Sequence, residues 1–303
     1  MLISFIIPVY NVERHLPDCL NSILNQGIES DNYEIILVED KSTDGSLQIC
    51  RDYCARYSNI TLIENEKNIG PGLSRNKGID ASHGEYLHFV DSDDALYPDS
   101  LRGLLSLGIT SESPDVIRFL SSVESNLDNS QNKILFKGKF LDHDTQKPYL
   151  SAWRFWFRRQ YVIDNNIYFT NKKTGQDTVF TFSILSNNPY IIITSELVYI
   201  YRHNRESVSN NEDISYINCL WEVIEEIKKI SAPHNLSAFY ITEVYKDVLG
   251  RFYRCRRSLQ ECVSFKKKLK SYEQYDTIIK NGRWYIQLSR MPLLLYIYIL
   301  IKK

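Results

Sequence analysis

The densest group of side chains that could do chemistry in this 303-residue sequence is Asp91-Ser92-Asp93-Asp94. It places three carboxylates within four residues, directly after the apolar run at residues 86–90. Like charges this close repel one another, and a hard divalent cation such as Mg²⁺ or Mn²⁺ relieves the repulsion through oxygen ligands. We therefore expect a metal site at the end of a strand; the alternative is a capped turn before the next helix.

Further polar motifs follow the other predicted strands of the N-terminal third. They are Pro8-Val9-Tyr10-Asn11, then Glu39-Asp40 with the polar run to Ser46, then residues 65–78, which contain Gly70, Gly72 and Arg75. The carboxyl ends of parallel strands meet at one edge of a sheet, where ligands gather. We expect these motifs to converge there.

Hydrophobic patterning predicts the elements that position the motifs. Apolar runs at 3–8, 34–39, 59–64 and 85–90 read as strands, and they alternate with helical patterns at 12–26, 42–57 and 72–81. This alternation is typical of a parallel sheet with helices on both faces. Further along, the pattern predicts strands at 116–121, 133–136 and 190–201, helices at 153–165 and 177–186, and helix from residue 214 to the end.

Taken together, in this order and at these strand ends, the motifs resemble glycosyltransferase family 2. Its members are inverting enzymes of the GT-A fold that use nucleotide sugars. The resemblance is dense over residues 1–100 and continues more thinly to about 210. It implies an α/β GT-A domain over 1–210, with a mostly parallel sheet between helices. Residues 1–100 would form its nucleotide-sugar-binding half and 101–210 its acceptor half, followed by a helical C-terminal region over 211–303.

The family's roles carry over to matching positions. For the nucleotide sugar, a UDP-sugar being favoured, the resemblance implies contacts by Pro8, Val9, Tyr10, Asn11, Glu39, Asp40, Arg75, Asp91, Ser92, Arg202 and His203. Tyr10 offers a ring to the base, and Asp40 accepts a hydrogen bond from it. Glu39 stands where many members have Asp. Arg75 lies near the diphosphate, for which its planar fork is suited.

For the metal, the resemblance implies that Asp93 binds the Mn²⁺ or Mg²⁺ ion that bridges the two phosphates. Asp91 lies near the ribose and the ion, and Asp94 is a third candidate ligand. Arg202 and His203 would neutralise charge on the leaving diphosphate. A surface turn after a strand is the alternative for those two.

The resemblance also implies that Asp177 is the general base. It lies in Gly175-Gln176-Asp177-Thr178-Val179-Phe180, where the family usually has Glu-Asp, so that one carboxylate remains for this role. The alternative is an ordinary helix N-cap. The implied reaction moves a sugar to a hydroxyl of a glycan or lipid-linked acceptor in cell-surface polysaccharide synthesis. A nucleotide-sugar-binding protein without turnover and a nucleotidyltransferase are the rival functions.

Composition and charge bear on location. The six cysteines form no CxxC pair and no secretory signal is visible, so we expect a reduced, cytoplasmic protein. Residues 251–303 hold 13 Lys or Arg and 3 Asp or Glu, and residues 291–301 are apolar. That run is shorter than the roughly 20 residues that span a bilayer.

We expect this tail to anchor the protein at the inner face of the membrane. The alternatives are a solvated helical face, or packing on the core or on a homodimer partner. Nucleic-acid binding is not expected, because no recognition motif accompanies the charge.

Overall fold

The structure is a computed structural model that describes residues 1–124, 133–140, 150–202, 214–232, 234–254 and 264. The chain divides into two compact units, Met1–Arg205 and Glu206–Lys303, and each is described by itself. The expected boundary after residue 210, His203 and the apolar run at 291–301 lie outside the described residues.

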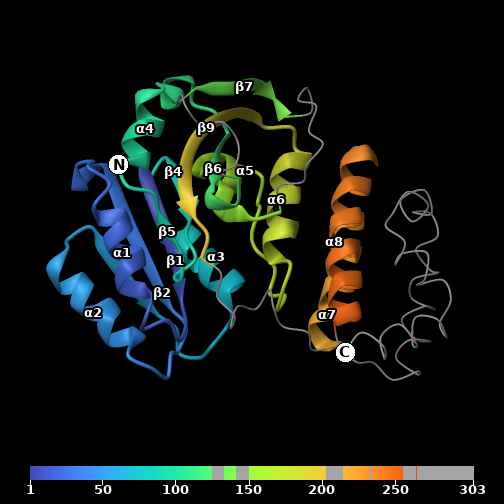
Figure 1. The fold of residues 1–303 in the computed structure, drawn as a ribbon, viewed down its shortest axis with the longest axis horizontal. Helices are drawn as coiled ribbons and strands as arrows, with labels where there is room; N and C mark the ends of the chain where they lie inside the picture. Colours follow the sequence, from blue (N-terminus) through green and yellow to red (C-terminus); the bar gives the residue numbers. More distant parts are fainter. Residues whose placement is uncertain (125–132, 141–149, 203–213, 233, 255–263, 265–303) are drawn as a thin grey trace. The chain divides into compact units, whose positions relative to one another are not determined.

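The first half of unit 1 alternates strands and helices (Figure 1). In chain order these are β1 (Ile3–Val9), α1 (Leu16–Leu24), β2 (Tyr33–Glu39), α2 (Ser46–Arg56), β3 (Ile60–Glu64), α3 (Pro71–Ala81) and β4 (Tyr86–Phe89). All seven were predicted from the sequence, within a few residues at their ends. β3, β2, β1 and β4 lie side by side and pair in parallel.

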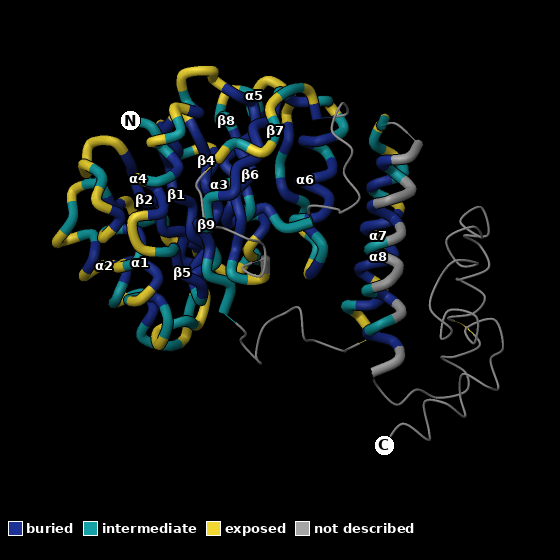
Figure 2. The backbone as a smooth tube through the Cα atoms, turned by 45° about the horizontal axis from the view of Figure 1, so that its top comes forward, coloured by how far each residue is buried: buried dark blue, intermediate teal, exposed yellow. Residues whose placement is uncertain are grey.

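Both faces of this sheet are covered by helices. Phe5 and Ile7 of β1 belong to a core cluster with Leu20 of α1 and Cys50 of α2. Ile6 points to the other face, where a side chain at Gly78 of α3 would collide with it. Figure 2 shows β1, β2 and β4 as buried, with exposed residues concentrated in loops and on outer helices. The alternation of apolar side chains to two covered faces explains why the strands are continuous apolar runs.

The second half of unit 1 extends the same sheet with mixed strand directions. Its elements are β5 (Ala95–Leu96), α4 (Ser100–Ser106), β6 (Val116–Ser121), β7 (Ile134–Lys139), β8 (Phe155–Arg158), α5 (Arg159–Asp164), α6 (Gln176–Ser186) and β9 (Tyr190–Ile200). The sheet order over the described residues is β3-β2-β1-β4-β8-β6-β9-β5, and β7 also pairs with β9. β8 is antiparallel to both β4 and β6, so the sheet as a whole is mixed.

One predicted helix is wrong in part. Residues 153–165 were expected to be helical, but Phe155–Arg158 forms β8 in the middle of the sheet, and the helix begins only at Arg159. Aromatic side chains favour strands when both neighbours of the strand are present. Here Trp156 pairs with His88 of β4 and Ile117 of β6. β5 and α4 were not predicted.

In its described part, unit 2 contains two helices that pack against each other, α7 (Ile214–Lys229) and α8 (His234–Arg254). On α7 the buried apolar residues recur at helical spacing: Ile217, Leu220, Val223, Ile224 and Ile227. Within the described part of the chain, no helix is long and apolar enough to cross a membrane.

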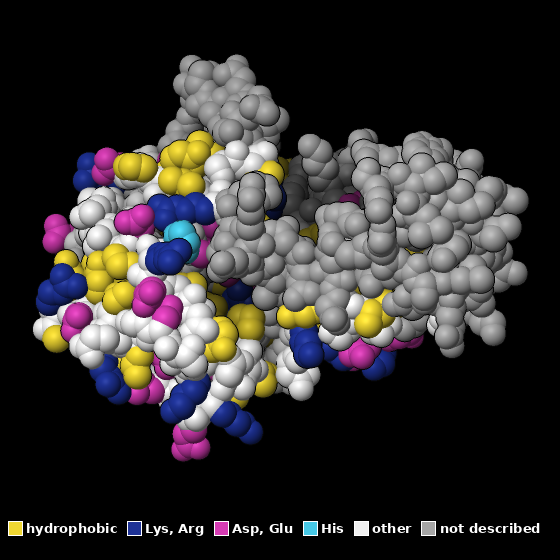
Figure 3. Space-filling model, turned by 60° about the horizontal axis from the view of Figure 1, so that its bottom comes forward, with side chains coloured by type: hydrophobic (Ala, Val, Ile, Leu, Met, Phe, Trp, Pro, Cys, Tyr) yellow, Lys and Arg dark blue, Asp and Glu magenta, His cyan; other side chains and the backbone are white. Residues whose placement is uncertain are grey.

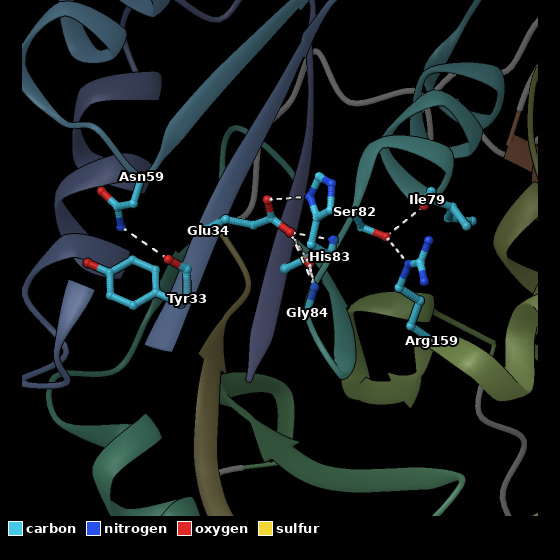
Figure 4. Close-up of polar contacts among 9 residues, drawn as sticks. Tyr33, Glu34, Asn59, Ile79, Ser82, His83, Gly84 and Arg159 are labelled. Carbon is cyan, nitrogen blue, oxygen red and sulfur yellow. Dashed lines mark hydrogen bonds and ion pairs between the residues drawn. The ribbon is translucent and has the colours of Figure 1, made fainter. Parts of the chain in front are cut away.

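A buried carboxylate joins three segments at the amino-terminal end of the parallel strands. Glu34 of β2 is 7% exposed, and its Oε1 accepts hydrogen bonds from Ser4 Oγ (2.6 Å), His83 N (2.6 Å) and Gly84 N (3.3 Å). Figure 4 shows the Glu34 side chain directed at His83 and Gly84, just before β4. A Cβ at Gly84 would lie 2.6 Å from Ser4 N, so only glycine allows this close approach.

We predict that Glu34→Ala lowers the free energy of unfolding by about 2 kcal/mol, because it leaves the Ser4 hydroxyl and the His83 N–H without their acceptor. Urea titration followed by circular dichroism measures the loss. Glu85→Ala, which removes an exposed carboxylate near the same turn, serves as the control and should stay within about 0.5 kcal/mol of wild type. Equal stability of the two variants would contradict the bridging role of Glu34.

Candidate active site

The aspartate turn (residues 91–94) follows β4 and closes on itself, since Asp94 N donates to Asp91 O at 3.0 Å. Asp91 and Asp93 are half-buried, whereas Asp94 is 1% exposed. Asp94 Oδ2 accepts the Tyr199 hydroxyl (2.7 Å), and Oδ1 accepts Arg202 N (2.8 Å). Both oxygens of Asp94 therefore bond to the protein, and this carboxylate holds the turn in place.

Burial raises the pKa of Asp94 to about 8; the charges of Asp91 and Asp93 add to this effect, and the bonds from Arg202 and Tyr199 oppose it. Within the described residues, no group of three or more Asp, Glu, His or Cys side chains is arranged to hold a metal ion. Asp91 and Asp93 remain as two partly accessible carboxylates. This donor set fits a hard cation that takes its other ligands from phosphate and water.

Arg75 connects the aspartate turn to Asp177, the predicted general base. It projects from α3, is 5% exposed, and donates from Nη2 to Asp91 Oδ1 (2.6 Å) and from Nη1 to Asp177 Oδ1 (3.1 Å). Its guanidinium also lies over the Phe169 ring, 5.2 Å from the centroid. Burial lowers the pKa of Arg75, but the two carboxylates outweigh this and the net shift is upward, so the side chain stays charged.

Asp177 lies in the first turn of α6 with its side chain 23% exposed. Besides Arg75 it contacts Ala152, whose N–H donates to Oδ2 at 3.2 Å. The N-cap position is occupied by Gly175, and no side-chain capping bond is formed there, which disfavours the capping alternative. Burial raises the pKa of Asp177, the Arg75 charge opposes the rise, and Asp91 adds to it; the net shift is upward. A carboxylate with a raised pKa is a stronger base than an ordinary aspartate.

At Gly72 the backbone of α3 lies against the Gln176 side chain of α6 and the backbone of Thr170. A Cβ at Gly72 would collide with Gln176 Oε1 and lie 2.6 Å from Thr170 O. One turn further along α3, Asn76 donates to Phe169 O and accepts from Phe169 N, both at 2.8 Å. These contacts fix the segment leading into α6, and with it Asp177, against the helix that carries Arg75.

Asp40, at the end of β2, is 2% exposed and supports the start of α3. Its Oδ1 accepts from Asn65 Nδ2 (2.9 Å) and Ile69 N (2.8 Å), and its Oδ2 accepts from Gly70 N (2.8 Å). Gly70 has a φ of 87°, and α3 begins at the next residue. Asp40 thus sets the turn from which Arg75 projects; its contact with a base stays a prediction.

The residues predicted to contact the nucleotide base are of two kinds. Pro8 and Val9 are buried within β1, whereas Tyr10 is 46% exposed at its end. Asn11, with a φ of 52°, accepts from Thr43 N at 2.8 Å and so ties the loop after β1 to the loop after β2. Glu39 accepts from Ser42 N (2.6 Å) within that second loop. Of these residues, Tyr10 has the exposed ring that can stack on a base.

The remaining residues predicted to contact the nucleotide sugar are Ser92, Arg202 and His203. Ser92 is buried in the aspartate turn, and His203 lies outside the described residues. The Arg202 side chain is 35% exposed and its Nη1 lies 3.4 Å from Asp18 Oδ2 of α1. It lines a shallow groove between α1 and β5 that lies beside the carboxylates rather than among them.

The prediction missed the roles of two aromatic residues and one amide. Tyr199 bonds the aspartate turn, Trp153 stacks on Tyr199 with ring centroids 4.5 Å apart, and Asn76 holds Phe169. A signal for Tyr199 was present, because a tyrosine between apolar neighbours at the end of a strand needs a partner for its hydroxyl. The partner itself lies 105 residues away in the chain.

The surface of unit 1 around these elements carries charges of both signs. Figure 3 shows acidic and basic side chains interspersed over the described face in view. The site therefore differs from its surroundings in having carboxylates and one guanidinium that are largely withdrawn from water.

The sequence of this chain is similar to those of known glycosyltransferases. The model of the family "Glycosyl transferase family 2" matches residues 4–165. A poly(ribitol-phosphate) beta-glucosyltransferase of Bacillus spizizenii is 32% identical over 75% of this chain and 37% of its own length. The poly(ribitol-phosphate) beta-N-acetylglucosaminyltransferase TarS of Staphylococcus aureus is 29% identical over 93% of this chain and 49% of its own length. The chain thus spans half or less of the length of these two relatives.

Solved structures share the fold. The crystal structure of S. aureus TarS residues 1–349 in complex with UDP-GlcNAc matches with a TM-score of 0.73 at 23% identity, covering 98% of this chain and 89% of that one. A mannosyltransferase of Pyrobaculum calidifontis in complex with GDP-Man and Mn²⁺ matches with a TM-score of 0.57 at 13% identity, over 99% and 86%. The GT-A fold expected from the sequence is confirmed. Since the family model covers more than half of its residues, this chain belongs to glycosyl transferase family 2.

Proposed function

We propose that this chain is an inverting, metal-dependent glycosyltransferase that moves a sugar from a UDP-sugar to a hydroxyl of a glycan or lipid-linked acceptor in cell-surface polysaccharide synthesis. The observation that carries the proposal is the Arg75 bridge, in which one guanidinium binds the strand-end carboxylate of Asp91 and the half-buried carboxylate of Asp177. A sugar transferase needs a carboxylate that activates the acceptor beside positive charge that accommodates a leaving diphosphate.

The donor class is supported by the relatives. Two of them are glucosyl- and N-acetylglucosaminyltransferases acting on poly(ribitol-phosphate), and the TarS structure holds UDP-GlcNAc. In this chain the exposed ring of Tyr10 and the loops tied together by Asn11 lie at the ends of β1 and β2, where a nucleotide base would stack.

A divalent cation fits the aspartate turn, with Asp93 and Asp91 as its protein ligands and Mn²⁺ or Mg²⁺ as the ion. When bound, it would neutralise charge on the diphosphate of the donor. The Mn²⁺ in the P. calidifontis mannosyltransferase supports this assignment. Asp94 is assigned to holding the turn, because both of its oxygens bond to Tyr199 and Arg202.

The chain's own residues divide the remaining work. Asp177 takes the proton of the acceptor hydroxyl as that oxygen attacks the anomeric carbon from the face opposite the leaving group. This single displacement inverts the configuration and needs no carboxylate nucleophile. Arg75 holds Asp177 and Asp91 at a fixed separation, and its positive charge opposes the rise in the pKa of Asp177 that burial causes.

Location and assembly remain proposals drawn from the sequence. The basic stretch and apolar run between residues 251 and 303 support a place at the cytoplasmic face of the membrane. Packing of the same run in a homodimer is the alternative. Fractionation of the full chain against a chain ending before Met291 separates the two outcomes.

A panel of nucleotide sugars, incubated with Mn²⁺ and an acceptor extract, tests the function through released nucleoside diphosphate. We expect release with at least one UDP-sugar, its loss in EDTA, and its recovery on adding Mn²⁺ or Mg²⁺. Asp93→Ala should abolish the metal-dependent release, while Asp31→Ala, which removes an exposed carboxylate, should not change it. Undiminished release in EDTA would contradict metal dependence.

Asp177→Asn should lower transfer by about 10²–10⁴-fold, because the amide cannot accept the acceptor proton. Donor affinity, measured by calorimetry, should stay within a few-fold of wild type. Asp52→Asn, at an exposed position, is the matched control. Full activity of Asp177→Asn would remove it from the base role, and loss of donor binding alone would favour a donor-binding role.

Arg75→Lys should lower transfer by at least about 10²-fold, because a single ammonium cannot reproduce the fork that joins Asp91 to Asp177. The measurement is kcat and KM for the donor. Arg51→Lys makes the same change in an exposed pair with Glu64 and should leave both constants unchanged. If the two variants behave alike, the bridge does not organise the site.

A further inference from the structure

We propose that Tyr199 is a positioning residue whose hydroxyl holds the aspartate turn and whose ring couples that turn to the segment that holds Asp177. The inference rests on the proposed function and adds a residue to it. Tyr199 lies near the end of β9, the strand that runs past β5 in Figure 1.

The hydroxyl of Tyr199 makes two bonds to the turn. It accepts from Asp91 N at 3.0 Å and donates to Asp94 Oδ2 at 2.7 Å. The side chain is fully buried, so water does not compete for either bond. Because the Asp91 N–H already points at the oxygen, the phenolic proton is directed to Asp94.

The Tyr199 hydroxyl therefore holds both ends of the turn, Asp91 and Asp94. Asp93, the proposed metal ligand, lies between them.

The ring of Tyr199 extends the link toward the base. It stacks on Trp153, with centroids 4.5 Å apart and planes 15° apart, and Trp153 stacks in turn on Tyr201. The residue before Trp153 is Ala152, whose N–H donates to Asp177 Oδ2. The ring of Tyr199 is thus linked through Trp153 and Ala152 to Asp177, while its hydroxyl holds the aspartate turn.

The test is Tyr199→Phe, which keeps the ring stack and removes only the hydroxyl. Calorimetry with UDP and Mn²⁺ should show affinity lowered by about 10-fold, because the variant loses both buried hydrogen bonds that hold the aspartate turn. Tyr190→Phe is the matched control, because Tyr190 lies on the same strand and its hydroxyl bonds exposed Glu112. That variant should bind UDP as wild type does.

A second variant tests the ring. Trp153→Phe retains an aromatic neighbour but reduces the overlap with Tyr199, and should lower kcat several-fold while UDP affinity stays unchanged. This split between turnover and binding would not arise from a general loss of stability. It also keeps the inference open to test if Tyr199→Phe does not fold.

The outcomes are separable. UDP affinity of folded Tyr199→Phe within two-fold of wild type overturns the hydroxyl's role, and unchanged kcat in Trp153→Phe overturns that of the stack. If the wild-type protein does not bind UDP in the presence of Mn²⁺, the proposed function is contradicted, and with it the role of Tyr199.

Discussion

The site depends on one buried guanidinium shared by two carboxylates. Arg75 is withdrawn from water, and a charge in that position is tolerated only where opposite charges and hydrogen bonds replace its hydration. Its partners lie 16 and 102 residues away in the sequence. Satisfying this one side chain therefore requires α3, the end of β4 and the start of α6 to meet at a single point.

Much of the surrounding structure can be understood as support for that meeting. Asp40 fixes the turn that begins α3, and Asn76 fastens the segment that leads into α6. On the other side of the Arg75 guanidinium, Asp94 and Tyr199 fix the aspartate turn. Each support is a hydrogen bond made by a buried or half-buried polar side chain. Each restricts motion that the reacting groups would otherwise have to lose when substrate binds.

The sequence was most informative where structure is local. β1, β2 and β4 are apolar runs followed by polar residues, so both the strands and the edge that carries their motifs could be predicted. Residues 155–158 could not, because their strand exists only between β4 and β6. The same limit applies to Asp94, whose spacing resembled that of a metal ligand. Its inward orientation depends on Tyr199, and no local pattern records a partner that distant.

The missing side chain at Gly72 has a consequence for redesign. Because the backbone of α3 lies against the Gln176 side chain and the Thr170 backbone, a side chain added at position 72 would push apart the helices that carry Arg75 and Asp177. Attempts to broaden acceptor choice would do better to alter the residues beside Ala152. At that point the contact with Asp177 is a single hydrogen bond from the Ala152 N–H. Substitutions beside Ala152 therefore need not disturb α3 and α6.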